Sequence, residues 1–141
     1  MQISMFYDDE NRGKIQFRDR ARQINDFSGL RYGNITPTDI DGFIEYHNNA
    51  MVFYEIKYGD KKMPYGQELS FMRLADNNQK AGTPSTVLVC RHNISDPEQD
   101  VNVAETIVSN IYYAGRWYED GTRTAKQVTD SFLQFAENKP F

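Results

Sequence analysis

Cysteine, histidine and tryptophan are scarce in this sequence of 141 residues, which contains one cysteine, two histidines and one tryptophan. A single cysteine, Cys90, excludes an internal disulfide, so a reducing, cytoplasmic location is the default expectation. Cys90 itself is interpreted as a small buried hydrophobic residue. His47 and His92 lie far apart and lack the spacing of a zinc site, so neither is predicted to bind a metal.

Long apolar runs and an excess of positive charge are also missing. No run of about 18 apolar residues occurs, so we expect no transmembrane helix and no membrane partner. Residues 1–9 lack the basic start and the apolar stretch of a signal peptide. The formal net charge of −4 counts against indiscriminate binding of nucleic acid, although the carboxylates of an empty cation site would contribute to this charge.

The chain does contain enough apolar and aromatic residues for one core. Hydrophobic residues make up 39% of the sequence, with 9 Tyr and 9 Phe, which favours a folded domain over a disordered segment. No linker, repeat or low-complexity tract interrupts it. We therefore predict a single domain over residues 1–141.

Local patterns predict an α/β protein. Helices are expected over residues 11–27, over residues 65–78, and from Thr124, where Thr124 and Gln127 have the spacing of a capping box. Runs of β-branched and aromatic residues predict strands at Leu30–Tyr32, Asp39–Tyr46, Met51–Tyr58 and Ser85–Cys90, with one or two more within residues 102–113. The Ser85–Cys90 run is the most apolar, so it should be the buried central strand. His47-Asn48-Asn49 is predicted to be a hairpin turn.

An acid and a lysine stand two residues apart at the end of an apolar strand. Strand side chains alternate between faces, so Glu55 and Lys57 should project to one side and Ile56 to the other. Opposite charges in such a place are costly unless something binds there. The alternative is a surface ion pair on an edge strand, which would contribute little. Asp41 lies on the preceding predicted strand, where by itself it could be a turn residue.

These residues resemble the PD-(D/E)XK nuclease superfamily, which has the restriction-endonuclease-like fold, and in particular its small members from phages and mobile elements. The resemblance covers about residues 11–93. It implies a core of a helix, a three-strand meander, a helix and a strand, here with a C-terminal strand-and-helix extension. The aspartate of the family falls on Asp41 and its Glu-x-Lys on Glu55 and Lys57. Gln67 matches the glutamine that some exonuclease members place on the following helix, although Phe71 stands where those members have tyrosine.

The resemblance also implies a chemistry for each residue. Asp41, Glu55 and the backbone carbonyl of Ile56 would hold Mg²⁺ or Mn²⁺, which such carboxylates suit. Asp39 is a rival to Asp41 for the metal, and both can contribute because they share a face. Lys57 would orient or help to deprotonate water, or stabilise the phosphate in the transition state. Gln67 would hold the phosphate or the water.

Several other groups have both a functional and an ordinary interpretation. The basic side chains of the first predicted helix could follow a phosphate backbone, or could form a solvated face; they are Arg12, Lys14, Arg18, Arg20 and Arg22. Lys61 and Lys62 follow the site strand in a loop, where they could meet DNA or simply be solvated. Trp117 and the tyrosines around it could stack on bases, but packing in a core or a dimer is the commoner use of such residues.

Three functions follow from this pattern. The first is a metal-dependent DNA nuclease that hydrolyses phosphodiester bonds, in the cytoplasm of a bacterial host if the chain comes from a phage. The second is a catalytically silent protein with the nuclease fold that binds or regulates. The third is a Holliday-junction resolvase. The segment from Ile94 onward is expected either to complete the sheet or to form a homodimer.

Overall fold

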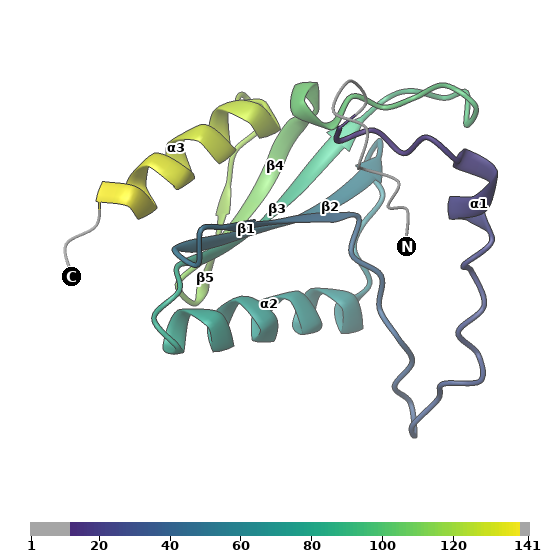
Figure 1. Cartoon of the computed structure of the whole chain (residues 1–141), viewed down its shortest axis with the longest axis horizontal. Helices are drawn as coiled ribbons and strands as arrows, with labels where there is room; N and C mark the ends of the chain where they lie inside the picture. Colours follow the sequence, from purple (N-terminus) through teal and green to yellow (C-terminus); the bar gives the residue numbers. More distant parts are fainter. Residues whose placement is uncertain (1–11, 139–141) are drawn as a thin grey trace. The chain divides into compact units, whose positions relative to one another are not determined.

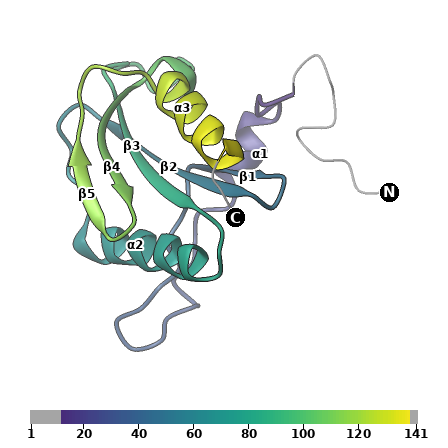
Figure 2. The ribbon, with the colours of Figure 1, turned by 90° about the vertical axis from the view of Figure 1, so that its left-hand side faces the viewer.

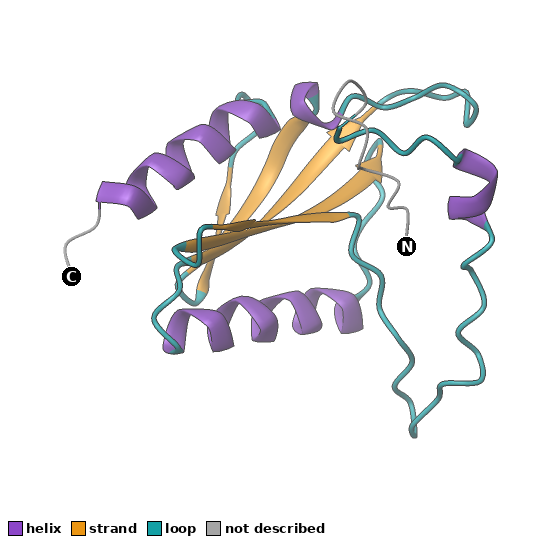
Figure 3. Ribbon diagram, viewed as in Figure 1, coloured by secondary structure: helices purple, strands orange, loops and turns teal. Residues whose placement is uncertain are grey.

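The computed structural model describes residues 12–138, which fall into two compact units divided after Pro37. Within residues 12–37, the first unit contains one short helix, α1 (Arg18–Arg22). The second unit is a mixed α/β layer structure (Figures 1 and 3). Its elements, in chain order, are β1 (Gly42–Tyr46), β2 (Ala50–Tyr58), α2 (Tyr65–Lys80), β3 (Ser85–His92), the 3₁₀ turn η2 (Val103–Glu105), β4 (Ile107–Tyr113), β5 (Arg116–Glu119) and α3 (Ala125–Asn138).

The five strands form one sheet in the order β1-β2-β3-β4-β5. Strands β2 and β3 are parallel and are connected through α2, whereas the other neighbouring pairs are antiparallel. Figures 1 and 2 show α2 on one face of the sheet and α3 on the other. Both faces are therefore covered, as a parallel pair with a helical crossover requires.

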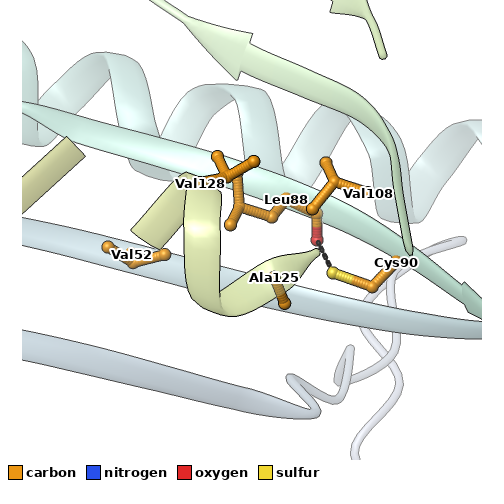
Figure 4. Close-up of a cluster of buried hydrophobic side chains, with 6 residues drawn as sticks. All are labelled: Val52, Leu88, Cys90, Val108, Ala125 and Val128. Carbon is orange, nitrogen blue, oxygen red and sulfur yellow. Dashed lines mark hydrogen bonds between the residues drawn. The ribbon is translucent and has the colours of Figure 1, made fainter. Parts of the chain in front are cut away.

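Strand alternation divides the core into two clusters. The cluster on the α3 face contains Val52, Leu88, Cys90, Val108, Ala125 and Val128 (Figure 4). The cluster on the α2 face contains Phe53, Phe71, Ala75, Val87 and Tyr112. Because Phe53 faces α2, Glu55 and Lys57 lie on that face as well, and Ile56 packs toward α3.

Several predicted elements are confirmed. Strand β3 is the middle strand of the sheet, its first six residues are buried, and Cys90 has no exposed surface. His47 and Asn48 adopt φ values of 53° and 60° in the β1–β2 turn, as a tight hairpin requires. The capping box of α3 is present, because the Thr124 amide donates to Gln127 Oε1 at 2.9 Å and the Gln127 amide donates to Thr124 Oγ1 at 3.2 Å.

The predicted helix over residues 11–27 is wrong in length. Asn11 lies outside the described residues, and the helix that forms is limited to Arg18–Arg22. The apolar spacing on which the prediction depended does not reflect a buried face, since Phe17 and Ile24 are 54% and 75% exposed. Gly13, with φ of 88°, is also incompatible with a continuous helix. Short helices that bury no side chain have little to stabilise them.

The predicted three-strand meander is also wrong, because Leu30–Tyr32 forms no strand. Only an isolated bridge between Tyr32 and Ile35 occurs there. Leu30 and Tyr32 are 49% and 71% exposed, so no packed face holds this segment in an extended conformation. Strand β1 begins at Gly42 rather than at Asp39. The segment after Ile94 completes the sheet with β4 and β5.

A buried tyrosine connects α2 to β4. The Tyr112 hydroxyl donates to the Asp76 carboxylate, 2.8 Å and 2.9 Å from its two oxygens. Desolvation, followed by the hydrogen bond to Asp76 and its negative charge, raises the pKa of Tyr112 to about 12. The tyrosine therefore resists ionisation more strongly in the folded state than in the unfolded chain.

This contact predicts an alkaline loss of stability. The folded state retains the Tyr112 proton between about pH 10 and about pH 12, where the unfolded chain loses it, so the free energy of unfolding falls across that window. Tyr112→Phe should lower the free energy of unfolding at about pH 8, by about 0.5–1.5 kcal/mol. The difference from the unmodified protein should shrink at about pH 11. Urea titrations of both proteins check this, and an equal difference at the two pH values would contradict it.

Candidate functional site

The Glu55–Lys57 pair is largely buried. Along this stretch β2 pairs with β3, whereas its pairing with β1 ends at Tyr54. The side chains of Glu55 and Lys57 are 4% and 17% exposed, and Lys57 Nζ contacts Glu55 Oε1 at 3.0 Å. Because both side chains are so little exposed, the alternative of a surface ion pair does not describe this arrangement. A buried pair of this kind requires further polar partners to offset its desolvation.

Asp41 lies where β1 separates from β2. The ladder ends where Gly42 is opposite Tyr54, so Asp41 is the first residue outside the paired segment. Asp41 does not continue the ladder, because its Oδ2 accepts the Ile56 amide at 2.7 Å instead. The amide and carbonyl of a strand residue point to the same edge, so the carbonyl of Ile56 is directed toward Asp41.

The two carboxyl groups affect each other electrostatically. Burial raises the pKa of Glu55, an effect opposed by the hydrogen bond from Lys57 and reinforced by the charge of Asp41. Desolvation also raises the pKa of Asp41, although the residue as a whole is exposed; the Ile56 amide lowers it and Asp39 raises it. The Glu55 carboxyl group also lowers the pKa of Asp41, so the two groups lie close to each other. Such a pair favours a shared proton or a shared cation.

One carboxylate oxygen of this pair has no partner. Glu55 Oε2 is buried and makes no hydrogen bond to any residue within 12–138. An unsatisfied buried carboxylate oxygen is costly, and it marks a place where a ligand can bind. Together with Asp41, this oxygen gives the donor set that a hard divalent cation prefers.

Gln67 approaches from α2, near the start of the helix. Its Oε1 is 3.4 Å from Lys57 Nζ, so the lysine lies between Glu55 and Gln67. Phe71, one turn further along α2, is 2% exposed and packs in the core of the same face. Phe71 therefore packs in the core, and of these two α2 residues Gln67 is the one that reaches the site.

The predicted site residues meet in space with one exception. Asp41, Glu55, Lys57 and Gln67 come together, and we call them the Glu55–Lys57 site. Asp39 acts on Asp41 and Glu55 only through its charge. Within residues 12–138, no three His, Cys, Asp or Glu side chains converge as a metal-binding group. Mg²⁺ commonly uses only one or two protein carboxylates and retains several waters, so the two acids suit it.

Other residues singled out in the sequence lie elsewhere. The side chain of His92 falls on the α3 face, where it packs on Tyr58 and its Nδ1 accepts the Ile94 amide. Trp117 packs on the buried ring of Tyr112, with ring centroids 5.1 Å apart. The basic residues of α1 belong to the first compact unit. Hollows lined by α3, for example by Thr129 and Phe132, lie on the opposite face from the Glu55–Lys57 site.

Two residues beside the site were not anticipated from the sequence. Arg91 is the partner of Lys57 on the neighbouring parallel strand β3, and the Arg91 Nε donates to Ser109 Oγ at 3.2 Å. A β-bulge in β4 accommodates Ser109, because Val89 pairs with Asn110 while Cys90 pairs with Val108. An arginine at the end of the most apolar strand was the one available sequence signal.

Comparison with known protein families, with curated proteins and with solved structures gives no match. None of the helices within residues 12–138 is long and apolar enough to cross a membrane.

Proposed function

We propose that this chain is a divalent-metal-dependent nuclease that hydrolyses phosphodiester bonds of DNA. The observation that supports this most is the unpartnered Glu55 Oε2, which lies buried beside a second carboxylate and a lysine. A structural ion pair needs no second acid with a raised pKa and no unsatisfied oxygen. A cation-binding hydrolytic site needs both acids in their ionised form, with oxygens available to coordinate.

Asp41, Glu55 and the Ile56 carbonyl would hold Mg²⁺ or Mn²⁺. When bound, such a cation lowers the pKa of water and neutralises charge on a phosphate. The raised pKa values of Asp41 and Glu55 mean that protons compete with the cation at a higher pH than they would at ordinary carboxylates.

Lys57 and Gln67 would act on the reacting groups. Lys57 Nζ is held between Glu55 Oε1 and Gln67 Oε1, which fixes the direction of its remaining donor. From there it can orient the attacking water or neutralise charge that develops on the phosphate. Gln67 retains its amide N–H donors for a phosphate oxygen or for the water.

The proposal is tested by incubating the purified protein with linear, single-stranded and branched DNA in Mg²⁺ or Mn²⁺. We expect cleavage that EDTA abolishes and that Lys57→Ala lowers by about 10²–10⁴-fold. Lys126→Ala, an identical change at a residue whose side chain is 66% exposed on α3, should leave the rate unchanged. Cleavage that persists in Lys57→Ala or in EDTA would contradict the proposal. Cation binding without cleavage of any DNA would favour a regulatory binding protein instead.

A further inference from the structure

Arg91 places a second positive charge next to Lys57. The two residues are paired across β2 and β3 and lie on the same face of the sheet. Within residues 12–138, Lys57 has Glu55 as a partner, whereas Arg91 makes no ion pair. Neighbouring like charges on adjacent strands are unfavourable unless an anion or a fixed set of hydrogen bonds compensates them.

The guanidinium of Arg91 is occupied mainly by the loop that follows β2. Its Nη1 donates to the Gly59 carbonyl at 3.3 Å and also to the Lys61 carbonyl. Its Nε donates to Ser109 Oγ, which in turn donates to the Val89 carbonyl at 3.2 Å. Arg91 therefore bridges the β2–α2 loop and the bulge of β4, a geometry that the planar guanidinium allows and an ammonium does not.

The β2–α2 loop is fixed at several points and adjoins the site at both ends. The Gly59 amide donates to the His92 carbonyl at 2.9 Å, and the Lys61 amide donates to the Tyr58 carbonyl at 3.2 Å. Further along, Met63 packs against the core cluster of the α2 face. The loop starts two residues after Lys57 and leads into the helix turn that carries Gln67. Lys61 and Lys62 are nevertheless exposed, so their ammonium groups extend into solvent from a fixed backbone.

We propose that Arg91 is a positioning residue that holds the β2–α2 loop so that Lys61 and Lys62 bind the phosphate backbone of DNA beside the Glu55–Lys57 site. This inference rests on the proposed nuclease function, since it gives that site its contact with the substrate strand. Asp60, also exposed in the loop, offsets one of the positive charges, so the loop and Arg91 together carry a net charge of two. This local excess lies on a chain whose total charge is −4.

The test measures the salt dependence of binding to a short, fluorescently labelled DNA duplex in EDTA, from about 50 to about 200 mM salt. Each phosphate contact contributes about 0.9 to the slope of log K against log salt. We expect Lys61→Ala/Lys62→Ala to lower the slope by nearly 2 relative to the unmodified protein. Lys80→Ala/Lys126→Ala, at two exposed lysines of α2 and α3, should lower it much less.

Variants of Arg91 separate positioning from a direct charge effect. Arg91→Ala should lower the slope by more than the single contact that its own charge could supply, because it also releases the two lysines. Arg91→Lys preserves the charge without the bridging geometry, so it should behave like Arg91→Ala. In the triple variant, the slope should fall by less than the sum of the two decreases caused by Arg91→Ala alone and by Lys61→Ala/Lys62→Ala alone. Full rescue by Arg91→Lys would overturn the positioning role.

An unchanged slope in Lys61→Ala/Lys62→Ala would overturn the phosphate contact, and this variant alters only exposed side chains. Should Arg91→Ala not fold, as circular dichroism would show, the lysine variant and Arg91→Lys still decide the outcome. The binding experiment and the nuclease assay fail independently. A lower slope in Lys61→Ala/Lys62→Ala, combined with no cleavage by the unmodified protein, would contradict the proposed function alone. Cleavage by the unmodified protein, combined with an unchanged slope in this variant, would contradict this inference alone.

Discussion

Glu55→Gln is expected to abolish most cleavage of DNA and to weaken the binding of Mg²⁺ or Mn²⁺. The amide retains the shape of the side chain and can accept a hydrogen bond from Lys57, but it removes the charge that a divalent cation requires. A cation contributes several kcal/mol to transition-state stabilisation, and a loss of about 4 kcal/mol corresponds to roughly 10³-fold in rate. Cleavage rates and calorimetric titration with Mn²⁺ measure the two effects.

The same variant should not unfold the protein. Burial raises the pKa of Glu55, so the folded state accommodates the charged carboxylate less well than the unfolded chain does. The amide can still accept a hydrogen bond from Lys57, so we expect Glu55→Gln to remain folded in metal-free buffer, with a urea midpoint close to that of the unmodified protein. Glu105→Gln, the same change at an exposed residue of η2, serves as the control and should retain full activity. A Glu55→Gln rate above about one tenth of the control would mean that this carboxylate does not hold the cation.

Leu88→Ala is expected to be the most destabilising of the single changes considered for this chain. Leu88 has no exposed surface and lies in the middle strand, where it packs with Val52, Cys90 and Val108 on the α3 face (Figure 4). Removing its side-chain atoms loses their transfer free energy and leaves a cavity, because the sheet cannot collapse around the gap. The expected cost is about 2–5 kcal/mol, measured as a shift of the urea midpoint at constant m value.

The matched control is Leu74→Ala on α2. Leu74 is 37% exposed, so the same truncation should cost less than about 1 kcal/mol. Equal losses in the two variants would contradict the assignment of Leu88 to a close-packed interior. The comparison also shows whether the α3 face of the sheet is as well packed as its burial suggests.

The sequence predicted best those elements in which local chemistry and tertiary packing agree. Local residues specify the conformation of three elements, and all three are found: the Ser85–Cys90 strand, the Asn-containing hairpin and the capping box of α3. The residues before Pro37 follow a helical spacing but bury no side chain in α1, so their periodicity was not a packing signal. Sequence patterns cannot distinguish an apolar residue that packs from one that remains exposed.

For the site, the alternation of side chains along a strand was a reliable guide, whereas contacts between distant segments could not be predicted from the sequence. The shared face of Glu55 and Lys57 follows from the period of a strand, and the approach of Gln67 follows from a helix that begins soon after. The approach of Asp41 to the end of β2 depended on the register of the hairpin, which its tight turn fixes, and on the hydrogen bond from the Ile56 amide. The contacts of Arg91 join segments about 30 residues apart and leave no local pattern, so no inspection of neighbouring residues could reveal them.

The bulge at Ser109 has a consequence for how this chain could tolerate a change in length. Val108 and Ile111 both reach the hydrophobic layer below α3, on either side of the additional residue. Excising Ser109 would therefore join two stretches that are already in phase, and the ladder between β3 and β4 would become regular. The hydrophobic interior would be preserved, whereas the hydroxyl that receives the Arg91 Nε would be lost. Deleting this one residue would thus have a small effect on the stability of the fold, while removing a hydrogen bond from the neighbouring polar network.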